Sequence, residues 1–264
     1  MNTLSHYLRV YRQIAKNGVA QSVAYRMEFV LRIFLGLLWA SVSIGILEIM
    51  FIHTTNINGW TKPELYLVLL SYNFTVQWSD AFARRVQYLE EYIRLGKMDT
   101  YFTKPIDTQF MMVFAELDIA GLVYPIGYTI PILFFLKPSI GIIPWERLPI
   151  FVFLIFLGNI LWICLKTIVM TVNFWRQRMD NLGILAWILT ETGKYPISVL
   201  PKPIRYVFYS IFPIAFFAIV PTEFLLNRSS FSAVLGACIV TVSMVTIARL
   251  IWQHAIKNYS SASN

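Results

Sequence analysis

Long apolar runs separated by short charged segments dominate the chain. Four runs carry few charged residues: 30–52, 111–136, 148–175 and 231–251. Each is long enough to cross the hydrocarbon core of a bilayer as an α-helix, which takes about 20 residues. These runs lack the alternation of apolar and polar residues that a membrane β-barrel requires. The pattern predicts an all-α integral membrane protein.

Two further stretches are long but less uniformly apolar. Stretch 64–83 contains several polar residues, and stretch 182–200 is interrupted by Glu191 and Pro196. We expect both to span the membrane, as the second and fifth helices. The sequence therefore predicts six transmembrane helices within a single domain, 1–264, because no internal repeat or linker divides it.

A seventh apolar stretch, 206–222, contains Pro213 near its middle and Pro221 near its end. Proline breaks a helix because it lacks a backbone N–H and clashes with the preceding turn. The stretch therefore favours a re-entrant helical hairpin at 201–226, between the fifth and sixth spans. A full crossing is the alternative, and it would place the C-terminus on the opposite side of the membrane.

Composition and charge agree with a membrane protein. The chain is 57% hydrophobic and 14% charged, whereas soluble domains are about 25% charged. An ordinary soluble enzyme and a disordered chain are thereby excluded. The formal net charge of +8 suits anionic lipid headgroups better than nucleic acid, so we expect membrane lipids as partners and no nucleic acid.

The distribution of Lys and Arg predicts the orientation. With the N-terminus inside, the cytoplasmic segments hold fourteen of these residues, Arg176 and Arg178 among them, against seven on the other side. Positive charge is enriched on the cytoplasmic side of membrane proteins. We therefore expect both termini in the cytoplasm and the plasma (inner) membrane as the location.

The N-terminal segment, 1–29, precedes the first span. Its apolar positions recur at helical spacing, and its basic residues lie away from them. The apolar positions are Leu4, Tyr7, Leu8, Tyr11, Ile14 and Ala15, and the basic ones are Arg9, Arg12 and Lys16. This pattern predicts an amphipathic helix in the cytoplasmic interface.

Motifs for enzymatic chemistry are not found in the sequence. Gly96-Lys97 and Gly193-Lys194 lack the earlier glycine and the following Ser or Thr of a phosphate-binding loop. The three His residues are far apart, and Cys164 and Cys238 both lie in apolar runs. We therefore expect no catalytic residues, no bound cofactor and no metal.

The pattern of segment 84–105 predicts a helix, a break and a short second helix. Val86, Leu89 and Ile93 share one stripe, Gly96 is placed to end the first helix, and Lys104-Pro105 stops the second. Such a charged, amphipathic segment is either a solvated loop or a docking element for a soluble partner.

Two sets of residues resemble permease subunits of bacterial ATP-binding-cassette (ABC) exporters of type 2. The first is Ile93-Arg94-x-Gly96-x-x-Asp99 followed by Lys104-Pro105, in which Met98 stands where the family usually has Leu. The second is a proline-punctuated region between the last two spans: Lys194-Tyr195-Pro196, Leu200-Pro201, Phe212-Pro213 and Val220-Pro221. The resemblance extends over nearly the whole chain through span number and layout.

The resemblance implies half of an exporter. Two permeases, identical or paralogous, would lie side by side and dock on two ABC ATPase subunits, which bind the ATP and Mg. Segment 84–105 would be the cytoplasmic coupling helix between spans 2 and 3, and the proline-rich region would form the outer gate. The coupling residues implied are Glu91, Arg94, Gly96, Asp99, Lys104 and Pro105.

Ionisable residues inside spans are costly and usually face protein or water. Glu48 and Asp80 lie near the ends of predicted spans and can reach the interface. The candidates for the translocation pathway or gate are Glu116, Asp118, Lys166, Glu191, Pro196, Pro213 and Pro221. We expect Lys166 to neutralise one of the two acids of the third span.

Three functions follow from this sequence. The first is a permease that moves a hydrophobic or amphipathic cargo outward with ATP hydrolysed by its partner. The second is a membrane-embedded enzyme acting on lipid, with Glu116, Asp118 and Glu191 as acid or base candidates, which would need two of them close together. The third is a non-transport membrane scaffold.

Overall fold

The computed structural model describes residues 3–175 and 182–259. Arg176 and Arg178, used above for the orientation, lie outside them. The secondary structure of this part of the chain is helical, apart from one isolated bridge between Ile57 and Trp60. The all-α prediction is therefore confirmed.

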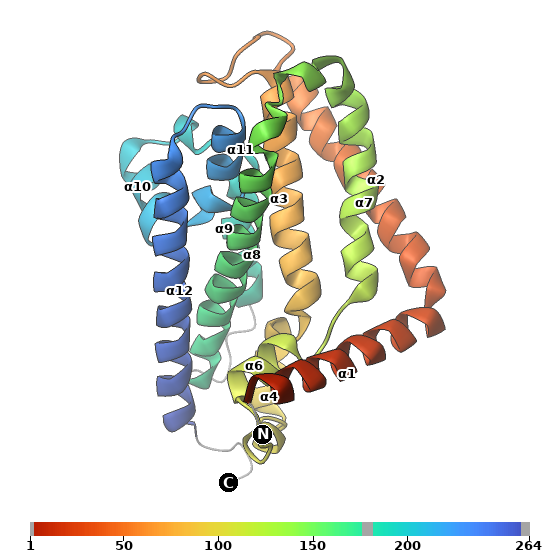
Figure 1. Cartoon of the computed structure of the whole chain (residues 1–264), viewed down its shortest axis with the longest axis vertical. Coiled ribbons are helices and arrows are strands. Elements are labelled where there is room, and N and C mark those ends of the chain that lie inside the picture. Colours follow the sequence, from red (N-terminus) through yellow and green to blue (C-terminus); the bar gives the residue numbers. More distant parts are fainter. Residues whose placement is uncertain (1–2, 176–181, 260–264) are drawn as a thin grey trace.

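Five long helices run along the longest axis of the molecule (Figure 1). They are α2 (Arg26–Met50), α3 (Lys62–Phe82), α7 (Ile119–Leu136), α8 (Leu148–Thr171) and α12 (Phe231–Lys257). Within the described residues, four segments are long and apolar enough to cross a membrane: Arg26–Met50, Ile119–Ser139, Trp145–Phe174 and Phe231–Lys257. These segments make the chain a multi-pass membrane protein.

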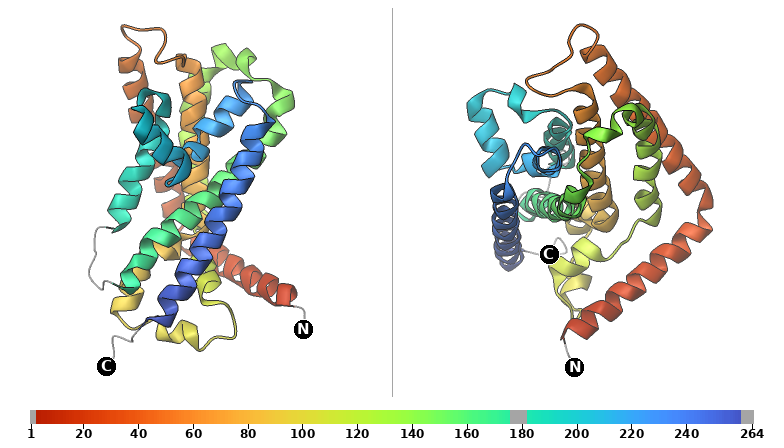
Figure 2. Two further views of the ribbon diagram at one scale, coloured as in Figure 1. Left: turned by 90° about the vertical axis from the view of Figure 1, so that its left-hand side faces the viewer. Right: turned by 45° about the horizontal axis from the view of Figure 1, so that its top comes forward.

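The N-terminal helix α1 (Thr3–Ala24) extends sideways from the lower end of the bundle (Figures 1 and 2). It ends earlier than the predicted 1–29, because the backbone of Tyr25, with φ −112° and ψ 48°, leaves the helical conformation and α2 begins at Arg26. Tyr7 and Tyr11 of the predicted apolar stripe contact Phe110 and Phe114, with ring centroids 4.9 and 6.3 Å apart. The stripe therefore packs partly on protein.

Glycines allow α2 and α7 to pack closely. A Cβ atom on Gly36 would lie 2.6 Å from the carbonyl oxygen of Tyr124, and one on Gly127 would collide with the carbonyl of Ile33. Small residues at helix crossings let two backbones approach, which is how many membrane helices associate. The α2–α7 contact depends on these two positions.

The predicted span 111–136 is wrong in its first part. The structure has two helices there, α6 (Thr108–Phe114) and α7, separated by residues 115–118. The break is stabilised by Asp118, whose side chain accepts a hydrogen bond from Gly121 N and so caps α7. The backbone N–H of Asp118 donates to Ala81 O rather than to a helical carbonyl.

The predicted span 182–200 is also shorter as a helix. Helix α9 (Leu182–Glu191) continues into a single 3-10 turn, η5 (Thr192–Lys194), and Tyr195 and Pro196 are extended. Proline disfavours a helical conformation for the residue before it, which explains why the helix ends there. A second 3-10 turn, η6 (Ile197–Val199), follows.

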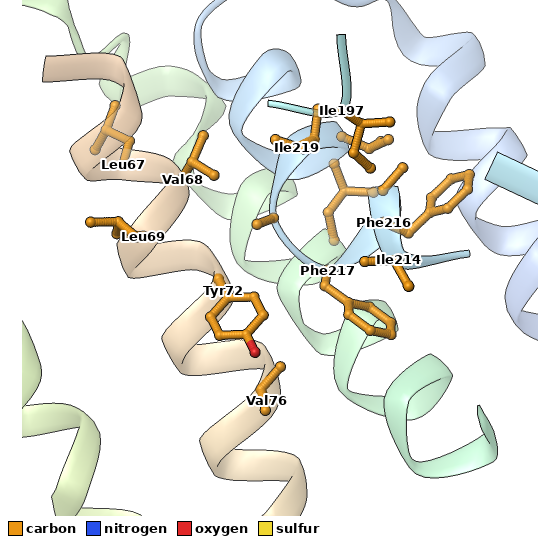
Figure 3. Close-up of a cluster of buried hydrophobic side chains, with 14 of the residues drawn as sticks. Leu67, Val68, Leu69, Tyr72, Val76, Ile197, Ile214, Phe216, Phe217 and Ile219 are labelled. Atoms are coloured by element: carbon orange, nitrogen blue, oxygen red, sulfur yellow. The ribbon is translucent and has the colours of Figure 1, made fainter. Parts of the chain in front are cut away.

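Segment 201–226 forms two short helices with a break between them. They are α10 (Lys202–Ser210) and α11 (Ile219–Leu225), and the 3-10 turn η7 (Ile214–Phe217) leads from Pro213 into α11. Residues of η7 and α11 pack against α3, and Figure 3 shows Phe217 beside Tyr72 and Val76. Ile197 of η6 belongs to the same hydrophobic core. The broken segment is therefore an integral part of the main hydrophobic core.

Segment 84–105, the start of α1 and the last turn of α12 all lie at the same end of the molecule (Figure 1). A second, smaller hydrophobic core fills this end. It joins the segment to α6, to the 3-10 turn η4 (Val172–Phe174) after α8, and to α12. A displacement of the segment would therefore change its contacts with α6, with α12 and with the end of α8.

Candidate coupling site and polar clusters

The predicted helix, break and short helix at 84–105 are present. The segment consists of η1 (Arg84–Tyr88), α4 (Leu89–Arg94) and α5 (Asp99–Phe102). The predicted apolar stripe, Val86, Leu89 and Ile93, is buried. Gly96 has a φ of +65°, in the left-handed region that glycine adopts without strain. The sequence therefore predicted both the buried side of this segment and its turn.

The predicted coupling residues lie together on the outer side of this segment. Glu91, Arg94, Lys104 and Pro105 are exposed, and Gly96 and Asp99 are half-buried. Glu91 and Lys97 form an exposed ion pair at 3.5 Å, and Lys104 Nζ lies 4.7 Å from the ring centre of Tyr101. Both signs of charge are thus presented to solvent within a few residues.

Tyr101 connects this surface to the helices. Its side chain is buried with Met98, Met112 and Trp252, and its hydroxyl accepts a hydrogen bond of 2.8 Å from Arg85. Burial raises the pKa of Tyr101 above its ordinary value, and the positive charge of Arg85 only partly opposes this. The phenol therefore stays protonated at neutral pH.

Glu116 and Asp118 are part of an arginine–carboxylate cluster at the same end of the molecule: Arg32, Arg84, Arg85, Glu116 and Asp118. Asp118 pairs with Arg84 and, at 3.4 Å, with Arg32, while Glu116 lies 3.7 Å from Arg84 and 3.6 Å from Arg85. The prediction that these acids lie inside the third span is wrong, because they occupy the break before α7.

Lys166 does not neutralise either of those acids. Its Nζ lies 2.7 Å from the Oδ1 of Asp80 on α3, and the same oxygen accepts a hydrogen bond of 3.0 Å from Trp162 Nε1. Lys166 is buried, whereas the Asp80 side chain keeps 37% of its exposure. The pair links α3 to α8, so the predicted link from Lys166 to the third span is corrected.

Glu191, at the end of α9, forms a third cluster with Tyr72 and Lys194. Its carboxylate accepts hydrogen bonds from the Tyr72 hydroxyl at 3.1 Å and from Lys194 Nζ at 2.5 Å. Lys194 Nζ also lies 5.2 Å from the ring centre of Tyr72. This cluster and the arginine–carboxylate cluster have no residue in common.

The three candidate prolines lie in the irregular region after α9 and are all buried. Pro196 follows η5, Pro213 precedes η7, and Pro221 is within α11. Thr75 on α3 donates a hydrogen bond of 2.7 Å to the carbonyl of Phe217, and Ser71 and Thr222 are 3.0 Å apart through their hydroxyls. Thr75 thus satisfies one carbonyl of the broken backbone, and Ser71 links α3 to α11 through side chains.

One cluster was not predicted. Asp107 caps α6 by accepting from Phe110 N, and it pairs with Arg249 of α12 at 2.6 Å. Its backbone N–H donates to the hydroxyl of Tyr7 on α1 at 3.2 Å. An Asp just before a helix is a recognisable capping signal, but the partners from α1 and α12 are 100 and 142 positions away.

Burial alone would raise the pKa of Asp107. The hydrogen bond and charge of Arg249, together with the N–H of Phe110, outweigh this effect and hold the pKa below its ordinary value. The carboxylate is therefore charged at neutral pH. Asp107 joins α1, α6 and α12 beside the coupling segment.

The described residues contain no group of three or more His, Cys, Asp or Glu side chains arranged to hold a metal ion. Cys164 and Cys238 are both free thiols.

Comparison with known proteins identifies the family. No curated protein matches the chain. The sequence model of one family, described as ABC-2 family transporter protein, matches residues 37–263. This match contains every long helix except α1 and the first turns of α2, as well as the coupling segment and the broken region. The chain belongs to the ABC-2 transporter family and is a membrane permease component of an ABC transporter.

Proposed function

We propose that this chain forms half of the translocation pathway of an ABC exporter and moves a hydrophobic or amphipathic cargo outward. Family membership implies an ATPase partner and a dimeric arrangement. In our proposal two ATPase subunits bind the ATP and Mg, and a second permease, identical or paralogous, completes the pathway. This chain contributes no catalytic residue and no cofactor site.

One observation carries the coupling role of segment 84–105. Its outer side presents exposed charges, while its inner side is part of the small core shared with α6, η4 and α12. A soluble subunit that pushes or rotates this segment therefore acts on several helices at once.

The arginine–carboxylate cluster offers a second route for the same movement. Arg85 joins Tyr101 of the coupling segment to Glu116, and Arg84 joins the start of the segment to Asp118, the cap of α7. Asp118 also reaches Arg32 on α2. Charge-assisted hydrogen bonds of this kind are strong and directional. The cluster would transmit a displacement of the segment to α2 and α7.

Six crossings are proposed, by α2, α3, α7, α8, α12 and the whole of segment 182–200, in which α9 is followed by η5 and η6; α10 and α11 are the re-entrant pair. Both termini and segment 84–105 are then cytoplasmic, in a bacterial plasma membrane. A reporter fused after the last residue tests this topology. Activity of an exported reporter at that position would contradict it.

The alternative of an enzyme acting on lipid is not favoured by the geometry. Its acid and base candidates were Glu116, Asp118 and Glu191. Glu116 and Asp118 are engaged by arginines, and Glu191 belongs to a different cluster with Lys194. A general acid and base must both reach the reacting group. Glu116 and Asp118 lie near each other, since both contact Arg84, but arginine ion pairs occupy both carboxylates.

The decisive experiment is reconstitution with the cognate ATPase in nanodiscs. We expect Arg94→Glu and Asp99→Lys to reduce stimulation of ATP hydrolysis and co-purification of the ATPase, because they reverse charges on the docking surface. Lys257→Glu reverses an exposed charge at the end of α12 and is the matched control. Unchanged stimulation in both coupling variants would remove the docking role of this segment.

A further inference from the structure

A cavity of about 160 Å³ lies among α2, α3, α7 and α9. Aromatic side chains from all four helices line it, among them Trp39, Tyr72, Tyr128 and Trp187. The amide of Asn73 and the Glu191–Lys194 ion pair complete its polar side. Two larger cavities of the described residues are almost wholly apolar, whereas this one combines aromatic walls with a polar side.

Two buried polar atoms at this cavity have no hydrogen-bond partner in the protein. They are Nδ2 of Asn73 and the hydroxyl of Tyr128, and each residue is only 2% exposed. Leaving a buried donor unsatisfied costs about 1–3 kcal/mol, so such atoms usually have a partner. Both atoms are covered by protein, so a molecule in the cavity accepts from them only after the two side chains rotate toward it.

The charges at the cavity are already paired. Glu191 accepts from Lys194 and from the hydroxyl of Tyr72, and Lys194 lies over the ring of Tyr72. A cation would have to displace Lys194 from the carboxylate, and an anion would have to displace the carboxylate from Lys194. The lining therefore favours an uncharged ligand.

Size limits the ligand further. A water molecule occupies about 30 Å³ in the liquid, so the cavity offers the space of about five waters. One six-membered ring fills such a space. Aromatic walls favour a ring because ring faces stack on them, and aromatic pairs contribute about 0.5–1.5 kcal/mol beyond the area that they bury.

We propose that this cavity binds one uncharged ring that carries a hydrogen-bond acceptor, as the polar part of an amphipathic cargo. Asn73 and Tyr128 donate to the acceptor, and Trp39 and Trp187 contact the ring. The role as a cargo site rests on the proposed transport function. Binding itself needs neither ATP nor the ATPase, so it is tested separately.

Two chemical sources could supply such a ring, an aromatic carbonyl compound or a sugar. The probes are therefore benzamide and methyl α-glucoside, with toluene and benzyltrimethylammonium as comparison molecules that lack the acceptor or carry a charge. Binding is followed by saturable quenching of tryptophan fluorescence in the purified permease in nanodiscs without ATP. We expect at least one of the two uncharged probes to saturate, and the one that does identifies the source.

The variants distinguish the loss of a contact to the ligand from a general destabilisation of the protein. Tyr128→Phe keeps the ring and removes a hydroxyl that makes no hydrogen bond within 3.5 Å, so we expect the fold to be retained. A net hydrogen bond contributes about 0.5–1.5 kcal/mol, and we expect Tyr128→Phe and Asn73→Leu each to weaken binding about threefold to tenfold. Asn17→Leu, on the exposed side of α1, is the control and leaves binding unchanged.

Several results would overturn the proposal. Saturable binding of toluene as tight as that of benzamide would remove the need for an acceptor. Tighter binding of benzyltrimethylammonium, lost in Glu191→Gln, would show a cation site instead. Absence of saturable binding by both uncharged probes, with ATPase stimulation intact, would remove the site and leave the proposed function standing.

Discussion

The ion pair between Lys166 and Asp80 leads to an asymmetric prediction about stability. The two charged atoms are 2.7 Å apart, but the exposed fraction of the side chain is 8% for Lys166 and 37% for Asp80. Removing the carboxylate therefore leaves an ammonium group enclosed by protein. Removing the ammonium group leaves a carboxylate that still reaches solvent or headgroups.

The magnitudes follow from this difference. Breaking a buried pair so that one charge stays uncompensated costs about 3–5 kcal/mol, and we expect Asp80→Leu to fall in this range. We expect Lys166→Met to cost about 1.5–3 kcal/mol, the value of a hydrogen bond to a charged group. The double variant loses both charges and leaves only Trp162 Nε1 without its acceptor. It should cost less than Asp80→Leu alone.

The free energy of unfolding is measured by titrating the purified protein with dodecyl sulfate in mixed micelles, after the transition has been shown to be two-state. Lys97→Met is the control, since the Lys97–Glu91 pair is exposed on both sides. Exposed pairs contribute about 0–1 kcal/mol. Equal costs for the two single variants, or a double variant that costs their sum, would refute this reasoning.

The remaining predictions concern packing and pH. Gly127→Leu should reduce the yield of folded protein severalfold, because the new side chain collides with α2. Gly45→Leu, at a position with open space around it, should not reduce the yield. Size-exclusion chromatography measures the folded yield of both variants. Asp118→Asn keeps an acceptor that can cap α7 but removes the charge that pairs with Arg84 and Arg32. It should lower ATPase stimulation with less effect on ATPase co-purification. The fold lowers the pKa of Asp107, so the charged carboxylate stabilises the folded protein. This stabilisation is fully present above the pKa of Asp in the unfolded chain, about 3.9, and is lost as the pH falls through the pKa of Asp107 in the folded protein. The difference in melting temperature between the wild type and Arg249→Met should thus shrink below about pH 4, and a pH-independent difference would contradict this.

The sequence by itself determined the features that depend on neighbouring residues. Apolar length predicted the long helices, because a span needs only a continuous apolar run. Local spacing predicted the buried stripe of Val86, Leu89 and Ile93 and the left-handed turn at Gly96. Proline positions predicted the interrupted helices around Pro196 and Pro213.

Only the tertiary structure decided which charges meet. Asp118 can cap a helix, but the apolar residues around it in the sequence predicted one continuous span and not the break. Its arginine partners come from α2 and η1. Lys166 pairs with Asp80 across 86 positions of the chain. A charge in a membrane protein is stabilised by the opposite charge that helix packing brings within a few ångströms. The distance between two such charges depends on the packing and cannot be derived from their separation in the sequence.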